Sequence, residues 1–126
     1  MATRVLLVDD DPVIRVLLQD YLTALQYQVQ VAESGIQCLE MLAKGTPDIL
    51  LLDFQMPVMN GLEVLKSIRG DPALQKLSVI MLSANRDTEK YITAAELTAD
   101  RYIIKPFEMR EITEAIQSMC GAQTAG

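Results

Sequence analysis

The chain has 126 residues, half of them hydrophobic, so it is about the size of one domain and has enough apolar side chains to fill a core. Its formal net charge of −6, from 17 acidic and 11 basic residues without a Lys- or Arg-rich tract, argues against direct nucleic-acid binding. We find no run of about 18 apolar residues and no secretory signal, so we expect a soluble, cytoplasmic protein that does not enter the membrane. The absence of histidine excludes any mechanism that needs an imidazole base of this chain.

The first predicted elements are a strand and an amphipathic helix. Arg4–Val8 is an apolar, β-rich run that stops at three carboxylates. Asp11 suits a helix N-cap and Pro12 a first helical position, so we expect a helix over residues 12–25. Its apolar stripe at helical spacing comprises Val13, Ile14, Leu17, Leu18, Tyr21, Leu22 and Leu25.

A second strand and helix follow, and then the most apolar strand. Gln28–Ala32 has a strand pattern, and Ser34 caps a predicted helix that runs to about residue 43 and stops at Lys44-Gly45. Residues 48–52 (DILLL) are typical of a strand buried on both faces, and this run too ends in a carboxylate, Asp53.

The second half of the chain continues the alternation of strands and helices. This order indicates a parallel sheet covered by helices on both faces. The predicted elements are a helix near residues 62–68 after the loop MPVMNG, a strand over 78–82, a helix over 87–97, a strand at Arg101–Ile104 and a last helix opened by Pro106, with Met109, Ile112, Ile116 and Met119 on its apolar stripe.

Polar side chains end four of these strands. They are Asp9-Asp10, Asp53, Ser83 and Lys105. Ligands of open parallel sheets bind outside the carboxyl ends of the strands, so these groups should meet at one edge. Each has an ordinary alternative. Asp9, Asp10 and Asp11 could simply cap the first helix, which is the interpretation we prefer for Asp11. Asp53, Ser83 and Lys105 could be ordinary loop or solvated residues. Their joint occurrence favours a site.

Such a site has the parts that phosphoryl transfer requires. Gathered carboxylates repel one another, and Mg²⁺ relieves this repulsion with a few carboxylates plus water. Lys105 and Ser83 would supply a cation and a hydroxyl for phosphoryl oxygens, and Asp53, central on the middle strand, would be the nucleophile. Cys38 and Cys120 are too far apart and too few for a zinc site, so we expect them to be reduced and structural.

Four segments resemble the receiver domain of two-component response regulators, and the resemblance covers nearly the whole chain. They are LLVDDDP at 6–12, DFQMPVMNG at 53–61, IMLSA at 80–84 and YIIKPF at 102–107. The resemblance implies an α/β, flavodoxin-like (βα)5 doubly wound parallel sheet with strand order 2-1-3-4-5. It also implies a receiver domain over residues 1–121, and we expect residues 122–126 to be a flexible tail.

The resemblance also implies a role for each matching residue. Asp53 is the expected phosphoacceptor. Mg²⁺ would be held by Asp10, Asp53 and the backbone carbonyl of Gln55, with Asp9 acting through water. Ser83 matches the switch hydroxyl, and Lys105 matches the lysine that pairs with Asp53 or its phosphate.

Further positions are assigned in the same way. Tyr102 matches the aromatic switch, although a core tyrosine with a wet hydroxyl is the ordinary alternative. The peptide bond before Pro106 is expected to be cis. Gln55 and Asn85 would tune dephosphorylation. The chain departs from the family at Thr98, where Gly is common, so the resemblance does not predict the geometry of that loop.

The expected function is a phosphorylation-controlled binding module rather than an enzyme, although it would assist its own phosphorylation and dephosphorylation. The donor would be a histidine kinase or phosphotransfer protein. The output surface would be the helix 4–strand 5–helix 5 face, with Tyr91 a candidate contact for an unknown partner. Pairing of two phosphorylated copies is left open, as is whether the chain is a stand-alone regulator or the front of a longer one.

Three other functions are weighed. A haloacid-dehalogenase-like phosphatase would need a second Asp where this chain has Gln55, and room for a cap domain. A flavin carrier would need a small, uncharged phosphate loop in place of DDDPV. A degenerate receiver without phosphoacceptor activity is disfavoured because Asp10, Asp53, Ser83 and Lys105 are all present.

Overall fold

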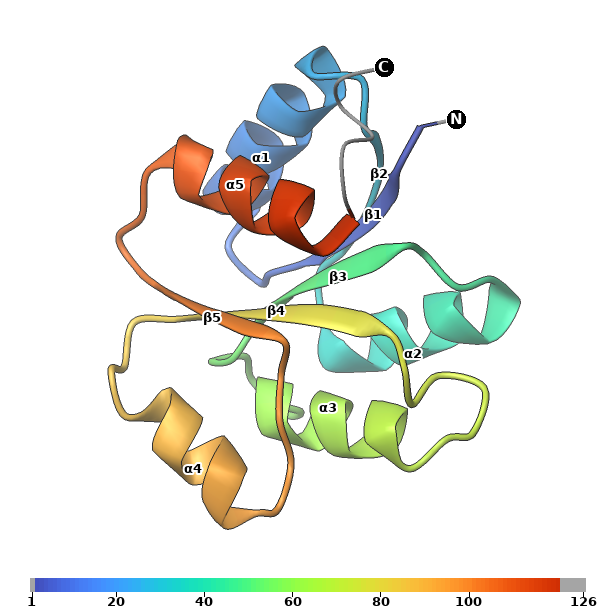
Figure 1. Cartoon of the computed structure of the whole chain (residues 1–126), viewed down its shortest axis with the longest axis vertical. Helices are drawn as coiled ribbons and strands as arrows, with labels where there is room; N and C mark the ends of the chain where they lie inside the picture. Colours follow the sequence, from blue (N-terminus) through green and yellow to red (C-terminus); the bar gives the residue numbers. More distant parts are fainter. Residues whose placement is uncertain (1, 121–126) are drawn as a thin grey trace.

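A computed structural model describes residues 2–120 and shows five parallel strands in the order β2-β1-β3-β4-β5. Strands and helices alternate strictly along the chain (Figure 1). The elements are β1 (Arg4–Val8), α1 (Pro12–Ala24), β2 (Gln28–Ala32), α2 (Gly35–Lys44), β3 (Ile49–Asp53), α3 (Gly61–Arg69), β4 (Ser78–Ser83), α4 (Thr88–Ala94), β5 (Arg101–Ile104) and α5 (Met109–Cys120). The predicted fold class and strand order are confirmed.

The helices form a layer on each face of the sheet. Helices α1 and α5 cover one face, and α2, α3 and α4 cover the other (Figure 1). Successive strand side chains point to opposite faces, so Leu6 and Val8 belong to the core under α2 and α3, whereas Val5 and Leu7 belong to the core under α1 and α5. Strand β3 is buried along its whole length because both of its faces are covered.

Three helix starts follow from local sequence. The side chain of Asp11 accepts a hydrogen bond from the Val13 N–H, and that of Ser34 accepts one from the Gln37 N–H, so both predicted N-caps are confirmed. Helix α3 begins with a reciprocal capping box, in which the side chains of Asn60 and Glu63 each accept from the other's backbone N–H at 3.0 Å.

The predicted apolar stripe of the first helix is partly wrong. Only Leu18 and Leu22 are buried on α1, whereas Val13, Leu17 and Leu25 are 43–62% exposed. The sheet and α5 cover one side of this helix, and its apolar pattern is wider than that side. An apolar strip therefore faces outward, beginning directly after the three N-terminal carboxylates.

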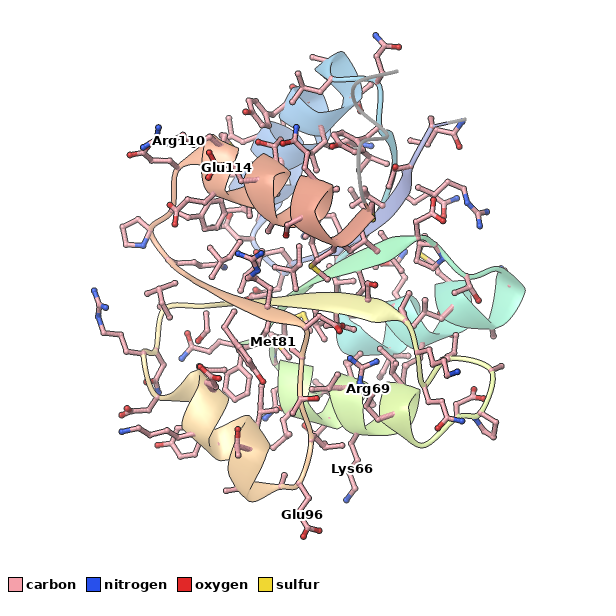
Figure 2. All side chains as sticks on the ribbon, viewed as in Figure 1. Lys66, Arg69, Met81, Glu96, Arg110 and Glu114 are labelled. Carbon is pink, nitrogen blue, oxygen red and sulfur yellow. The ribbon has the colours of Figure 1, made fainter. Side chains whose placement is uncertain are left out.

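Helix α4 is shorter than the predicted 87–97. It ends at Ala94, and the Glu96 and Leu97 N–H groups donate back to the Thr93 and Ile92 carbonyls, the pattern of a Schellman C-cap. Glu96 takes the left-handed position, with φ of 61°, and its side chain points away from the sheet (Figure 2). The left-handed residue is thus Glu96, and Thr98 has no positive φ, so this loop does not need a glycine at Thr98.

Other element boundaries also differ from the sequence prediction. Helix α5 begins at Met109 and not at Pro106, because the Glu111 side chain and backbone both bond to Glu108 and set the first turn there. Strands β3 and β4 extend to Asp53 and Ser83 themselves. Cys38 and Cys120 are free thiols, as predicted. The expected tail at 122–126 lies outside the described residues, and none of the helices described is long and apolar enough to cross a membrane.

Candidate functional site

The carboxyl ends of the central strands bring the predicted site residues to one edge of the sheet. Asp53 is the last residue of β3 and Ser83 the last of β4, and Asp53 pairs in register with the residue just before Ser83. The backbone then locks the edge, since the Phe54 N–H donates to the Leu82 carbonyl at 2.8 Å and the Lys105 N–H to the Ser83 carbonyl at 2.8 Å. These side chains are therefore held by the sheet itself.

Three carboxylates gather at this edge. One oxygen each of Asp9, Asp10 and Asp53 lies within 4.8 Å of the others. Asp9 and Asp53 are 0% and 3% exposed, whereas Asp10 is exposed. Asp9 also receives a hydrogen bond at 2.9 Å from the Asp11 N–H, which orients its carboxylate toward the cluster.

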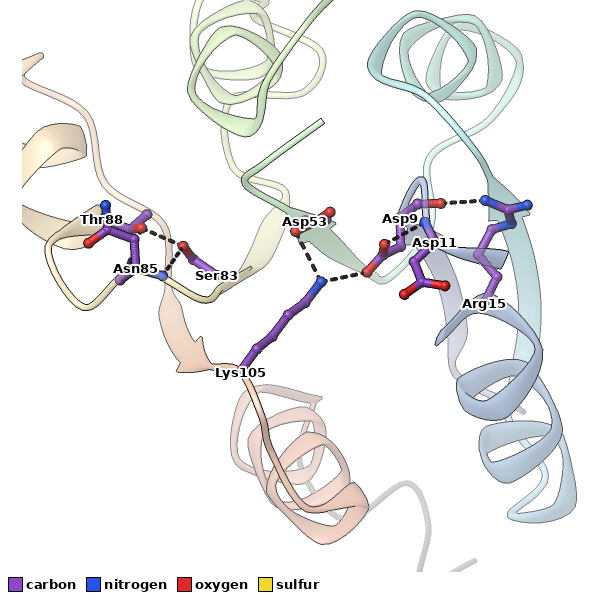
Figure 3. Close-up of polar contacts among 8 residues, drawn as sticks. All are labelled: Asp9, Asp11, Arg15, Asp53, Ser83, Asn85, Thr88 and Lys105. Atoms are coloured by element: carbon purple, nitrogen blue, oxygen red, sulfur yellow. Dashed lines mark hydrogen bonds and ion pairs between the residues drawn. The ribbon is translucent and has the colours of Figure 1, made fainter. Parts of the chain in front are cut away.

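Lys105 is the cation of the site. Its ammonium lies 3.0 Å from Asp9 Oδ2 and 3.2 Å from Asp53 Oδ1 and so bridges the two buried carboxylates (Figure 3). Burial lowers the pKa of Lys105, but its hydrogen bonds to Asp9 and Asp53 and their charges outweigh that effect, and the pKa is raised. The lysine therefore stays charged over the physiological range.

One lysine does not neutralise the cluster. The pKa of Asp53 is raised to about 7, chiefly by burial and then by the charge of Asp9, and the charge and hydrogen bond of Lys105 offset these effects only in part. A small dication would remove this repulsion. The donor set, three carboxylates with one open to solvent, suits Mg²⁺, which prefers oxygen ligands and keeps several waters.

The loop after Asp53 is held by a close backbone approach. The Gly61 N–H donates to the Phe54 carbonyl at 2.7 Å, and a Cβ added at Gly61 would lie 2.7 Å from Phe54 Cα and 3.0 Å from the Asp53 carbonyl oxygen. Only glycine fits there without moving the segment that carries Asp53. Val58, in the same loop, is 89% exposed and has a φ of 69°, which is unfavourable for a β-branched residue.

The Ser83 hydroxyl is turned away from the carboxylates. It accepts a hydrogen bond from the Asn85 N–H at 3.0 Å and lies 2.6 Å from the Thr88 hydroxyl, toward α4 (Figure 3). The Asn85 side-chain oxygen accepts from the Asp87 N–H at 2.8 Å, so it is engaged within the same loop.

Of the remaining predicted residues, Tyr102 lies within β5, whereas Gln55 and Pro106 follow the ends of β3 and β5. Tyr102 is half-buried on β5, and its hydroxyl accepts from the Ala99 N–H at 3.0 Å. Gln55 is an exposed loop residue two positions after Asp53. The peptide bond between Lys105 and Pro106 is cis.

Two contributing residues were missed from the sequence. Arg15 donates to the backbone carbonyl of Asp9 at 2.7 Å and lies 3.8 Å from Glu33, so it ties the first acidic segment to the chain after β2. Its position one turn into an apolar helix was the available signal. Thr88 had no such signal, because nothing in the sequence reports that its hydroxyl faces Ser83.

Comparisons with known proteins agree with this geometry. The family model described as the response regulator receiver domain matches residues 5–117. The chain is 34% identical to the response regulator MprA of Mycobacterium tuberculosis over 94% of its own length and 51% of that protein, so it spans about half of this relative. It is 35% identical to the chemotaxis protein CheY-3 of Vibrio cholerae, over 92% of this chain and 90% of that one.

Solved structures show the same likeness. The response regulator TrrA of Thermotoga maritima, whose structure is a complex with Mg²⁺-BeF, superposes with a TM-score of 0.82 at 32% identity, over 93% of this chain and 98% of that one. The fold, the acidic strand-end cluster and these relatives lead to one assignment. The chain belongs to the receiver domain family of two-component response regulators.

Proposed function

We propose that Asp53 is the phosphoacceptor of this receiver domain and that its phosphorylation changes which proteins the domain binds. The observation that carries the proposal is the Lys105 ammonium, which bridges Asp53 and Asp9 inside a cluster of three carboxylates. Receiver domains of response regulators take their phosphoryl group from histidine kinases, so the donor atom is a histidine nitrogen of a partner.

The residues of the chain divide the work of this transfer. An Asp53 oxygen would attack phosphorus while the bond from phosphorus to the donor nitrogen breaks, and the electron pair of that bond leaves with the donor. The Lys105 ammonium, 3.2 Å from Asp53, is placed to neutralise the phosphoryl oxygens. The Ser83 hydroxyl, on the neighbouring strand, would donate to a phosphoryl oxygen once it leaves its present partners.

Mg²⁺ would be held by Asp10, Asp53 and the Gln55 carbonyl, with Asp9 acting through water. When bound, it supplies positive charge to the transferring phosphoryl group. The support from the chain is the donor set, together with the pKa of Asp53, which is raised first by burial and then by the charge of Asp9. Gln55 and Asn85, which lie two residues after Asp53 and Ser83 respectively, are proposed to set the rate of dephosphorylation.

The assignment can be tested with a small donor. With acetyl phosphate and Mg²⁺, the intact protein should gain the mass of one phosphoryl group, and Asp53→Asn should gain none. Asp10→Ala should bind Mg²⁺ measurably more weakly in a calorimetric titration. Equal labelling of Asp53→Asn would refute the phosphoacceptor assignment, and an unchanged Mg²⁺ affinity in Asp10→Ala would refute the metal site.

The phosphodonor protein is proposed to dock on the outward side of α1. Val13, Val16 and Leu17 are exposed there, directly after the carboxylate segment, so a partner seated on them can reach Asp53. An exposed apolar patch of this kind marks an interaction surface. Tyr91, on α4 beneath the opposite face of the sheet, belongs instead to the proposed output surface of α4, β5 and α5 (Figure 1).

A phosphotransfer assay distinguishes the roles of the two proposed surfaces. Leu17→Gln should slow phosphotransfer from a histidine kinase that phosphorylates the wild-type chain, and should leave labelling by acetyl phosphate unchanged. Tyr91→Gln is the matched control, because it removes an equally exposed apolar side chain from the other face. A Leu17→Gln variant that accepts from the kinase at the wild-type rate would refute docking on α1.

The remaining assignments complete the proposal. The receiver unit comprises residues 1–121 and acts in the cytoplasm. It catalyses no reaction on a separate substrate. Tyr102 is the aromatic switch, whose orientation changes with the phosphorylation state and so alters the output surface. The output partner is a protein, and phosphorylation-dependent pairing of two copies is one form that it can take.

A further inference from the structure

We propose that Thr88 is a latch for the switch hydroxyl. Its hydroxyl oxygen accepts the hydrogen bond that Ser83 would otherwise donate to a phosphoryl oxygen, and so holds Ser83 in the unphosphorylated orientation. The inference rests on the proposed role of Ser83. Both hydroxyl-bearing residues are 2% exposed, and their oxygens lie 2.6 Å apart, at the junction between the end of β4 and the first residue of α4.

The direction of this hydrogen bond follows from counting hydrogens. The Thr88 hydroxyl lies 2.9 Å from the Asn85 carbonyl oxygen. Because a carbonyl oxygen can only accept, Thr88 donates its one hydroxyl hydrogen there. The Ser83 oxygen already accepts from the Asn85 N–H at 3.0 Å. The short contact between the two hydroxyls must therefore use the hydrogen of Ser83, with Thr88 as the acceptor.

That hydrogen is the one that phosphorylation would require. A phosphoryl group carries acceptor oxygens, so Ser83 can bind it only by donating. Asp53 lies on the strand beside Ser83, one residue out of register, so a phosphoryl group on Asp53 and the Thr88 oxygen compete for the same hydrogen. Thr88 acts on the reaction through Ser83 and is a positioning residue.

The latch also joins the pocket to α4. Helix α4 is short, and its N-cap residue Asp87 makes no side-chain capping bond, whereas the Thr88 hydroxyl in its first turn bonds to both Ser83 and Asn85. Ser83, Thr88 and Tyr102 border one cavity of about 220 Å³ between β4, β5 and α4. If the Ser83 hydroxyl donated to a phosphoryl oxygen instead, Thr88 would keep its bond to Asn85 but lose its bond to Ser83, so the first turn of α4 would lose this link to β4 beside the Tyr102 ring.

The test uses beryllium fluoride as a phosphoryl mimic at saturating Mg²⁺, with its affinity measured by calorimetry. Thr88→Val keeps the shape of the side chain and removes the competing acceptor, so the mimic should bind roughly 2- to 10-fold more tightly, the range expected for one net hydrogen bond. Thr88→Ser should restore the wild-type affinity. The matched control is Thr113→Val on α5, which loses a buried hydroxyl bonded to a carbonyl three residues back, as in Thr88, but far from Ser83.

A double-mutant cycle separates the latch from a structural role. In a Ser83→Ala background, Thr88→Val should leave the affinity for the mimic unchanged, whereas a structural defect would act in both backgrounds. If Thr88→Val does not fold, Thr88→Ala has the same expected gain. A wild-type chain that does not bind the mimic would overturn the proposed function. A wild-type chain that binds it, with Thr88→Val and Thr88→Ala no tighter, would overturn the latch alone.

Discussion

Replacing Asp53 with asparagine should stabilise the metal-free protein, and the gain should depend on pH. The pKa of Asp53 rises from 3.8 to about 7 in the fold, chiefly through burial. Each pH unit is worth about 1.4 kcal/mol, so ionised Asp53 costs the folded state at most roughly 4 kcal/mol. Solvent that reaches the pocket beside the exposed Asp10 reduces part of this cost, and we expect Asp53→Asn to gain about 2–3 kcal/mol at pH 8.

The sign of the pH dependence follows from proton binding. Between about pH 4 and pH 7 the folded state holds a proton on Asp53 that the unfolded chain has released, so the stability contributed by this site falls as the pH rises through that window. Asparagine does not titrate. The gap between the variant and the wild type should therefore be small at pH 4, grow up to about pH 7 and stay constant above it.

The difference in the free energy of unfolding between Asp53→Asn and the wild type can be measured by urea unfolding monitored by circular dichroism, because the chain has no tryptophan for fluorescence. The free energies should be compared at pH 4.5 and pH 8 in EDTA, with equal m-values as the check on two-state behaviour. Added Mg²⁺ should stabilise the wild type more than the variant and narrow the gap at pH 8. A gap that is equal at both pH values would refute the raised pKa of Asp53 on which this prediction rests.

Three further substitutions test how the site is supported, each by urea unfolding. Gly61→Ala should lose about 1–3 kcal/mol, because its new methyl group would lie 2.7 Å from Phe54 Cα; an unchanged stability would mean that the loop yields freely. Val58→Gly should gain about 0.5–1 kcal/mol by relieving a positive φ, and a loss would contradict the strain. Arg69→Met should lower the free energy of unfolding by about 2–3 kcal/mol, because the guanidinium donates to three backbone carbonyls and to Asp100 (Figure 2). A loss below about 0.5 kcal/mol would show that these bonds are redundant.

The strand-end site was predictable because it depends on chain order. Short apolar runs that alternate with helices make a parallel sheet, and the carboxyl ends of parallel strands share one edge. Asp9, Asp53, Ser83 and Lys105 each end such a run, so their approach follows from the pattern and needs no side-chain geometry. Local caps such as Asp11 were predictable for the same reason, since a cap bonds only to residues a few positions away.

The tertiary structure decided whatever depends on contacts between elements. The apolar stripe of α1 is wider than the surface that buries it, so only packing determined that Leu18 is buried and Leu17 is exposed. The sequence by itself determined that Ser83 ends a strand beside Asp53. Only the fold determined that its hydroxyl faces Thr88, because that orientation depends on where the first turn of α4 packs against β4.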